Sequence, residues 1–277
     1  MSWISKRVYT VILVVVVTGI VIGSSRRSAA QTSKFVSEAD VISGTVTHLV
    51  LGPLPTIVNI PPVDQSTTAT AGSNEVTGTD VSQTLFGVEV YKIENVDDVT
   101  EDDDTATLDD GIGKAKTGKG SLLGDLVTWT SNDDPLTCSF DPTIPNPQVG
   151  CTSTETTHGL KINGVAIPAG AYPGGSTFPV SGTLSGDGSS CPSGVGVETF
   201  TGYLSLQEST IGRNATTGKF SVAVTGIHLF GQSVCIVNSA QVLYTNSWDL
   251  KVAGPEIETN ELGTESKNPA DVTIQEM

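Results

Sequence analysis

The stretch LKINGVAI, residues 160–167, places Asn163-Gly164 between two short apolar runs, with Pro168 directly behind. Two consecutive residues at positive φ suit Asn-Gly and few other pairs, so this is the strongest short-range hairpin signal in the chain. A turn held this firmly could present a functional group or set a strand register. We expect it to set the register of two strands.

Strand-type chemistry extends along most of the chain, which is rich in Thr, Val, Ser and Gly. No stretch after residue 30 keeps apolar residues at helical spacing over three turns, and Gly and Pro fall mostly between strand-like runs. The sequence therefore predicts an all-β fold, a β-sandwich or jelly-roll-like single domain over residues 31–253, preceded by an N-terminal signal helix. The clearest runs are 43–51, 84–93, 122–130, 199–206, 220–230 and 241–252.

The first thirty residues have the layout of a secretory signal. Lys6-Arg7 precedes an apolar run over 8–23, and Ser28 and Ala30 fit the small-residue positions of a cleavage site. We predict a signal peptide over 1–30. The alternative is an uncleaved signal anchor, because Arg26-Arg27 lies close to the expected cut. Either interpretation carries the rest of the chain across a membrane, to an extracellular or cell-surface location.

The charge of the chain excludes one class of partner. The sequence holds 30 acidic and 14 basic residues, a formal net charge of −16. The first thirty residues contain four of the basic residues and none of the acidic ones, so the remainder carries −20. Such a charge repels nucleic acid and anionic lipid headgroups, so we expect no nucleic-acid partner. We expect contact with a membrane only through the N-terminal segment, if that segment is not cleaved.

Four cysteines follow the leader, an even number that indicates two disulfides in an oxidising compartment. Three pairings are possible. We favour Cys138–Cys151 with Cys191–Cys235, because the first pair brackets the proline-rich segment DPTIPNPQVG (141–150). A metal site would need closely spaced Cys or Cys/His pairs, which the sequence lacks.

Two acidic segments interrupt the strand pattern. Residues 97–110 read DDVTEDDDTATLDD, which we interpret as a solvated loop, and residues 254–277 as a disordered acidic tail. Closely spaced carboxylates supply the oxygen ligands that Ca²⁺ prefers, although the spacing is not that of an EF-hand. The weak calcium candidates are Asp102, Asp103, Asp104, Asp109 and Asp110. No other cofactor is expected.

Catalytic motifs are scarce. Residues 113–120 come one residue short of a phosphate-binding loop, since Gly120 replaces the required Ser or Thr, and we interpret this match as a coincidence. His48, His158 and His228 are the only histidines, and neither a nucleophile elbow nor an HExxH motif occurs, so no catalytic residue is assigned.

Three acids on strand-like runs, Glu89, Glu198 and Glu208, could pair in space as in glycoside hydrolases. Trp129 and Trp248 are the only tryptophans after the leader, too few for an extended sugar-stacking platform but enough for a small one. Asn214 begins an N-x-[ST] sequon, a glycosylation candidate only in a host that modifies such sites.

Three stretches carry a family resemblance: HGLKINGVAIPAGAYPG (158–174), GYLSLQES (202–209), and KFSVAVTGIHLFG with VNSAQV (219–231 and 237–242). Together they resemble the choice-of-anchor P family of bacterial exported proteins. The resemblance covers about residues 39–244. Gln207 stands where the family has Asn, and Thr225-Gly226 where Asn-Ala is usual. The resemblance implies a secreted or surface-exposed β-rich domain with no established catalytic residues.

Three functions follow as hypotheses. The first, which we favour, is a structural or adhesive cell-surface protein, assisted by Ca²⁺ and not an enzyme, with an extracellular-matrix, cell-envelope or carbohydrate partner. The second is a carbohydrate-binding module with Trp129 or Trp248 exposed on a concave face. The third is a hydrolase whose paired carboxylates face each other across a cleft.

Overall fold

A computed structural model gives the fold, and every regular element in its described part is a β-strand. The all-β prediction is therefore confirmed at that level. The predicted signal segment and the sequon residue Asn214 lie outside the described residues. Residues Gln31–Met277 form one unit, separate from Met1–Ala30. The structure describes residues 32–50, 55–63, 66–70, 72–78, 80–104, 109–140, 149–154, 156–168, 174–184, 191, 196–213, 220–238, 241–259 and 273–276.

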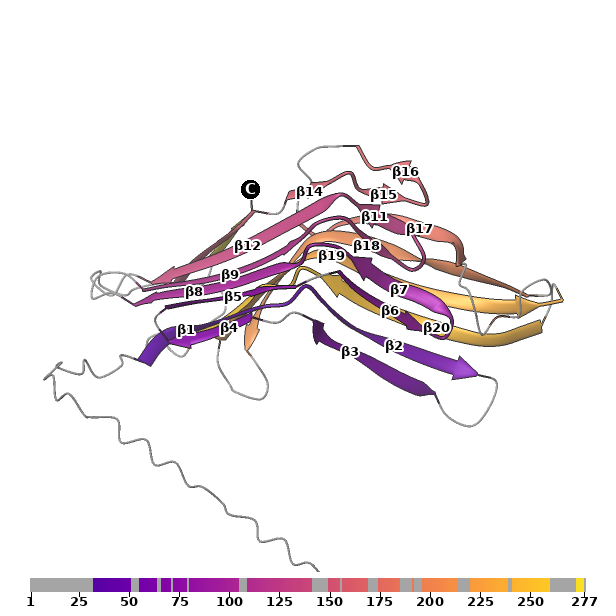
Figure 1. The fold of residues 1–277 in the computed structure, drawn as a ribbon, viewed down its shortest axis with the longest axis horizontal. Coiled ribbons are helices and arrows are strands. Elements are labelled where there is room, and N and C mark those ends of the chain that lie inside the picture. Colours follow the sequence, from indigo (N-terminus) through magenta and orange to yellow (C-terminus); the bar gives the residue numbers. More distant parts are fainter. Residues whose placement is uncertain are drawn as a thin grey trace, which may run out of the picture. The chain divides into compact units, whose positions relative to one another are not determined.

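The strands form three sheets, and Figure 1 labels most of these strands. The nine-stranded sheet contains β1 (Thr32–Ala39), β2 (Ile42–Val50), β3 (Thr56–Val63), β4 (Ser66–Thr70), β17 (Ser176–Leu184), β18 (Gly196–Arg213), β19 (Phe220–Val237), β20 (Gln241–Val252) and β21 (Glu256–Thr259). The six-stranded sheet contains β6 (Val81–Leu85), β7 (Val88–Ile93), β10 (Gly120–Leu122), β11 (Val127–Trp129), β15 (Lys161–Ile162) and β16 (Val165–Ala166). The seven-stranded sheet contains β5 (Gly72–Thr77), β8 (Asp97–Asp104), β9 (Asp109–Thr117), β12 (Ser131–Phe140), β13 (Val149–Ser153), β14 (Thr156–His158) and β22 (Thr273–Glu276).

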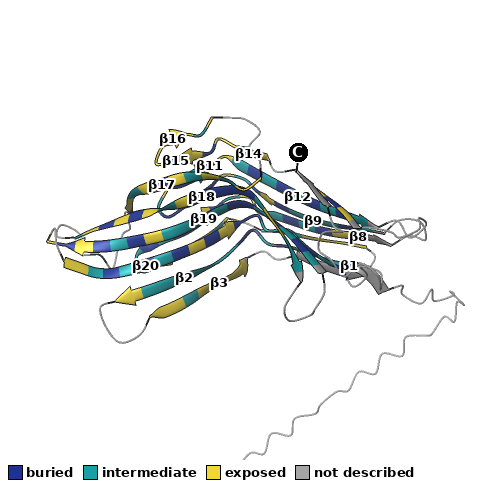
Figure 2. Ribbon diagram, turned by 180° about the vertical axis from the view of Figure 1, so that it is seen from behind, coloured by how far each residue is buried: buried dark blue, intermediate teal, exposed yellow. Residues whose placement is uncertain are grey.

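Strand β19 organises the nine-stranded sheet. Its whole length pairs with β18, which in turn pairs with β17. On its other side, the C-terminal part of β19 pairs with β20, followed by β2 and β3, while its N-terminal residues pair with β21, followed by β1 and β4. These pairings are all antiparallel. The sheet therefore has two halves, one ordered β17-β18-β19-β20-β2-β3 and the other β18-β19-β21-β1-β4. Figure 2 shows the strands of the first half side by side.

A line of strand interruptions separates these halves, and we call it the break line. It consists of Asp40-Val41 between β1 and β2, the Gln207 and Gly226 pair within β18 and β19, and Ala253 to Pro255 between β20 and β21. Gln207 and Ala253 have φ values of 51° and 56°, which interrupt the extended backbone. The Ala253 and Gly254 amides still donate to the Val41 and Asp40 carbonyls, both at 2.8 Å, so the sheet stays hydrogen-bonded across the line.

Two apolar clusters hold the sheets together. The larger cluster joins side chains of the β17-to-β3 half with side chains of the six-stranded sheet, among them Phe200, Leu250 and Trp129. The smaller cluster joins Phe35 of β1 and Ile257 of β21 with side chains of β12, β13 and β19. Each of the five residues named here is almost completely buried. Burial of this apolar surface is the main stabilising contribution to a fold without helices in its described part.

Two local predictions are confirmed. Asn163 and Gly164 have φ values of 50° and 76°, and they join β15 to β16 with Ile162 directly opposite Val165. This is the two-residue hairpin that the sequence indicates. The disulfides are Cys138–Cys151 and Cys191–Cys235, the favoured pairing. The first bridge links paired residues of β12 and β13, and the second links residue 191 to β19.

The interpretation of residues 97–110 as a loop is wrong for most of the segment. Asp97–Asp104 forms β8, which pairs with β9. Asp97 lies directly opposite Lys116, and opposite charges on paired strands stabilise a sheet. On the other face, Asp98 and Asp102 are buried above the small residues of β9. Pairing with β9 therefore makes this segment a strand, although its own acidic composition does not favour one.

The predicted disordered tail also begins too early. Residues 256–259 form β21, which is paired on both sides, with β1 and with β19. Ile257 of this strand is 1% exposed and belongs to the smaller apolar cluster. Residues 273–276 form β22, which pairs in parallel with β13. The β-rich unit thus extends beyond residue 253, because the alternating residues after Pro255 complete the sheet beside β19.

Candidate functional site

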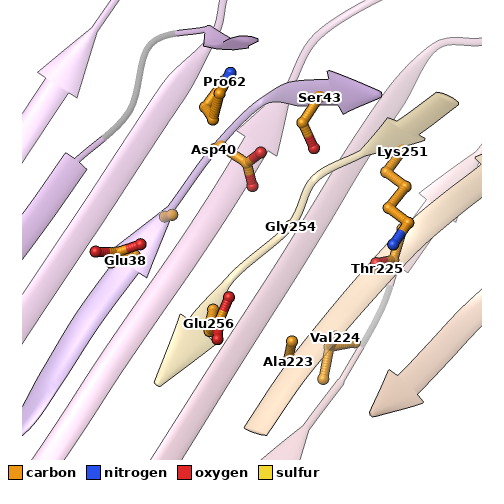
Figure 3. A pocket seen from close by; sticks show the side chains of 11 residues that line it. Glu38, Asp40, Ser43, Pro62, Ala223, Val224, Thr225, Lys251, Gly254 and Glu256 are labelled. Carbon is orange, nitrogen blue, oxygen red and sulfur yellow. The ribbon is translucent and has the colours of Figure 1, made fainter. Parts of the chain in front are cut away.

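A cavity of about 270 Å³ opens at the break line of the nine-stranded sheet. Its polar lining comes from β1, β2, β19, β20 and β21 and from the turn between β1 and β2, and Figure 3 shows these side chains. These polar residues are Glu38, Asp40, Ser43, Thr225, Lys251 and Glu256. Register explains why they meet, because Glu38 lies directly opposite Glu256, and Ser43 opposite Lys251. Gly254 lines the centre of the cavity, where a Cβ atom would collide with the Asp40 carboxyl group.

Asp40 is the most perturbed acid of this cavity. Burial raises its pKa from 3.8 to about 6, the Ser43 hydroxyl opposes that shift through a hydrogen bond, and Glu256 and Glu38 raise the pKa further. Lys251 lowers it only slightly, as the weakest of these influences. Glu256 accepts a hydrogen bond of 2.6 Å from the Ser221 hydroxyl. The cavity therefore holds a carboxyl group that exchanges its proton close to neutral pH, beside two further carboxylates.

His228 forms a bridge beside this cavity. Its Nδ1 lies 2.6 Å from Glu208 Oε2 on β18, and its Nε2 lies 2.9 Å from Asp249 Oδ1 on β20. Burial alone would lower the pKa of His228, but the hydrogen bonds to Asp249 and Glu208 raise it above 6.5. The same hydrogen bond lowers the pKa of Asp249 below 3.8. Two carboxylate acceptors are satisfied together only when both ring nitrogens carry protons.

The bridge and the cavity adjoin. His228 lies directly opposite Lys251 on β20, and Glu208 lies directly opposite Thr225 on β19, and both opposed residues line the cavity. Charged side chains from β1, β18, β20 and β21 therefore gather at the break line. The sequence shows Glu208 and His228 on separate strand-like runs, and no local pattern brings them together or singles out Asp40.

Beyond the charged region lies the outer face, which we define as the side of the β17-to-β3 half that points away from the apolar clusters. One row across the six strands contains Pro179, Tyr203, Phe230, Asp249, Thr45 and Asn59. The next row contains Ser181, Thr201, Gln232, Ser247, Thr47 and Ile57. A third row contains Thr183, Thr199, Val234, Thr245 and Leu49, and the last contains Val197, Ile236 and Val242.

These outer-face residues are exposed or half-buried, and no side chain in the last three rows is charged. Tyr203 is 52% exposed, and its ring centroid lies 5.9 Å from that of Phe230 on the next strand. Phe230 in turn lies 4.9 Å from the His228 ring. Three rings thus form a continuous series between the uncharged rows and the charged break line.

Two of the three glutamates proposed for paired catalysis lie far apart on one strand. Glu89 is on β7 of the six-stranded sheet, whereas Glu198 and Glu208 are both on β18. Ten residues of strand separate those two by about 33 Å. Glu198 and Glu208 therefore do not face each other across a groove.

Glu198 is instead the centre of a buried polar network. Its carboxyl group accepts hydrogen bonds from Ser233 Oγ (2.5 Å), Tyr244 Oη (2.7 Å) and Asn246 Nδ2 (3.0 Å). The Trp248 indole donates to Ser233 Oγ at 2.8 Å. Glu198 is 2% exposed, so these contacts support a structural role for the side chain.

The tryptophans do not form an exposed platform. Trp129 is 1% exposed and donates to Thr117 Oγ1 at 2.8 Å, while Trp248 is 2% exposed. Both belong to the larger apolar cluster. The expectation that one of them lies on an open binding face is therefore wrong, because each ring fills core volume between sheets.

The remaining histidines have local structural contacts. His48 Nδ1 lies 2.6 Å from Asn246 Oδ1, and its ring stacks on Phe86 at 4.1 Å. His158 is exposed and pairs through its backbone with β12. Neither residue lines the cavity at the break line.

The phosphate-loop match is confirmed as a coincidence. Residues 113–117 belong to β9, Gly118-Lys119 is a turn, and Gly120 begins β10. A phosphate-binding loop requires a following helix whose N-terminus faces the phosphates. Here the segment joins two strands instead.

The calcium candidates lie on the β8 and β9 strands. Asp103 is directly opposite Asp110 and Asp104 opposite Asp109, and Asp102 is buried. Side chains of Asp103, Asp104 and Asp109 lie outside the described residues. Among the side chains that the structure does describe, no group of three or more His, Cys, Asp or Glu residues could hold a metal ion.

Comparisons add no relative. No protein-family model matches the chain, and no curated protein matches it. Within the described ranges, the structure contains no helix of the length and hydrophobicity needed to cross a bilayer.

Proposed function

We propose that this chain is an exported, disulfide-stabilised β-sandwich protein with a structural or adhesive role at the cell surface, acting through the outer face. One observation carries the proposal. A chain with a net charge of −16 leaves one broad sheet face exposed and, over three rows, free of charged side chains. Exposed faces of this kind indicate contact with another surface.

The sandwich part of the proposal is supported by the clusters described above. The nine-stranded sheet supplies one side of both apolar clusters, and the six-stranded and seven-stranded sheets supply the other. Export is supported by the leader sequence and by two disulfides with no free cysteine in the described part. The resemblance to choice-of-anchor P proteins agrees with both.

Bead retention tests the adhesive role. The full chain is expressed with its leader, recovered from the exported fraction, coupled to beads and passed over envelope fragments of the producing cells. The double variant Thr201→Glu, Gln232→Glu places two charges on the outer face. We expect it to reduce retention at least about tenfold, because each buried unpaired charge costs well over 1.4 kcal/mol.

The matched control places the same charge elsewhere. Thr152 and Thr156 are exposed on β13 and β14 of the seven-stranded sheet. The variant Thr152→Glu, Thr156→Glu should leave retention unchanged. Equal retention by the wild type and both variants, or no retention by the wild type, would refute adhesion through the outer face.

Asp40 supports a second candidate function, a hydrolase. A carboxyl group with a pKa of about 6, in a cavity that Glu38 and Glu256 also line, has the protonation behaviour of a general acid. The test is hydrolysis of aryl glycosides at pH 5–6 by the wild type and by Asp40→Asn. Activity that Asp40→Asn abolishes supports this function, and the absence of turnover by the wild type rejects it.

Calcium assistance stays a prediction from the sequence. Binding at the β8 and β9 hairpin should raise the melting temperature as millimolar calcium is added. Asp103→Asn with Asp110→Asn should remove that increase.

A further inference from the structure

We propose that the outer face binds an uncharged polysaccharide chain, with Tyr203 and Phe230 as the stacking surface and Asp249 as the principal hydrogen-bond acceptor. This inference rests on the proposed function and specifies its partner. Sugars present apolar C–H faces and rings of hydroxyl groups, so a site that holds them needs aromatic faces next to polar groups.

The aromatic part is already assembled. Tyr203 is more than half exposed, and Phe230 supports it from the adjacent strand at a tilt of 32°. Both residues lie in one cross-strand row, so their rings are held by the sheet and need little ordering on binding. Exposure of a large aromatic ring beside a second ring costs solvation energy that a stacked ligand would recover.

The polar part lies on the next strand. Asp249 is directly opposite Phe230, and its side chain is 56% exposed while its Oδ1 accepts from His228 Nε2. His228 is thus a positioning residue that fixes the orientation of the carboxylate. The adjoining row adds the Thr201 hydroxyl and the Gln232 amide, which both donate and accept hydrogen bonds. Sugar hydroxyls match this mixture of groups.

The charge distribution selects an uncharged partner. The net charge of −16 repels polyanions and also disfavours a second copy of the same chain. A polycation would find its ionic partners at the acidic break line instead of the uncharged rows. A neutral polymer experiences neither effect, and its hydroxyl groups match the Thr and Ser rows.

The extent of the face favours a polymer over a single sugar. The first two rows cross all six strands from β17 to β3, which lie side by side in Figure 2. Adjacent strands lie about 4.8 Å apart, so such a row is about 24 Å long. Several linked sugar rings are needed to cover that length, and many weak contacts then add to one affinity.

Affinity electrophoresis tests the inference. The full exported protein is run through native gels that contain soluble glucan, mannan, galactan or xylan, with polygalacturonate and chitosan as charged comparisons. Tyr203→Ala and Asp249→Ala remove the stacking ring and the acceptor. We expect at least one neutral polymer to retard the wild type and each variant to bind it about tenfold more weakly.

Two exposed residues outside the face serve as controls. Val165→Ala on β16 and Glu101→Ala on β8 change an apolar and an acidic side chain on the other sheets. Both should bind like the wild type, and thermal melts confirm that all four variants are folded. Retardation by chitosan or polygalacturonate alone, by no polymer, or equally for Tyr203→Ala and Val165→Ala would overturn the inference.

The two proposals can fail separately. Retention of coated beads that depends on the outer face, without retardation by any neutral polymer, would reject the polysaccharide and keep the adhesive role. The opposite result is that beads coated with the wild type are not retained, while a neutral polymer retards the wild type but not Tyr203→Ala. That result would reject adhesion and keep the polysaccharide-binding site.

Discussion

Replacement of Glu198 by alanine tests whether the buried network is structural. The variant removes the acceptor of three hydrogen bonds, from Ser233, Tyr244 and Asn246. Each such bond contributes about 1 kcal/mol net, and the one lost methylene contributes about 0.8 kcal/mol. We therefore expect Glu198→Ala to lower the free energy of unfolding by about 4 kcal/mol.

Urea unfolding followed by tryptophan fluorescence measures this loss, because Trp248 belongs to the same network. For a domain of this size the loss corresponds to a melting temperature lower by roughly 10 °C or more. Glu101→Ala, at an exposed position, is the matched control and should change stability by less than about 0.5 kcal/mol. A loss below about 1 kcal/mol for Glu198→Ala would refute the structural role, especially if enzymatic activity disappeared with it.

Three further predictions concern pH and the disulfides. Burial raises the pKa of Asp40 from 3.8 to about 6 in the folded state, so ionisation of this carboxyl group destabilises the fold as pH rises from 4 through 6. The free energy of unfolding of Asp40→Asn should therefore exceed that of the wild type by about 3 kcal/mol at pH 7.5 and equal it below pH 4. The pKa of His228 is raised above 6.5, so its bridge stabilises fully below that value and is lost as pH rises through the folded pKa. Relative to His228→Gln, the wild type should have a free energy of unfolding about 1 kcal/mol higher at pH 5.5, and this difference should shrink as pH rises through the folded pKa. The effect is small because Asp249 is largely exposed. Removal of the Cys191–Cys235 bridge, which spans 44 residues, should lower the free energy of unfolding by about 4 kcal/mol. Removal of Cys138–Cys151, which spans 13 residues, should lower it by about 3 kcal/mol.

Thermal melts across pH 3.5–9 test the first two, and urea unfolding of paired Cys→Ala variants tests the third. A flat difference between wild type and Asp40→Asn would show that this carboxyl group has an ordinary pKa. A constant His228→Gln difference across pH would show that the ring acts through packing alone. Equal losses for the two bridges would contradict the dependence on loop length.

Several features were determined by the sequence itself because they depend on neighbouring residues. Asn163-Gly164 specifies its turn through the positive φ values that both residues tolerate, and the all-β class follows from alternation within single runs. The disulfide preference was also local in origin, since Cys138 and Cys151 flank a short segment and meet as paired strand residues.

Other features depended on tertiary structure because they require the register between distant strands. Asp97–Asp104 has a loop-like composition, yet it is a strand because β9 lies beside it with Lys116 in register. Asp40, Lys251 and Glu256 share a cavity only because β1, β2, β20 and β21 are all interrupted at the same level. The His228 bridge likewise joins three strands whose relative alignment no local sequence pattern predicts. The uncharged rows of the outer face can be recognised only when the six strands are aligned, because their residues alternate along each strand with buried ones.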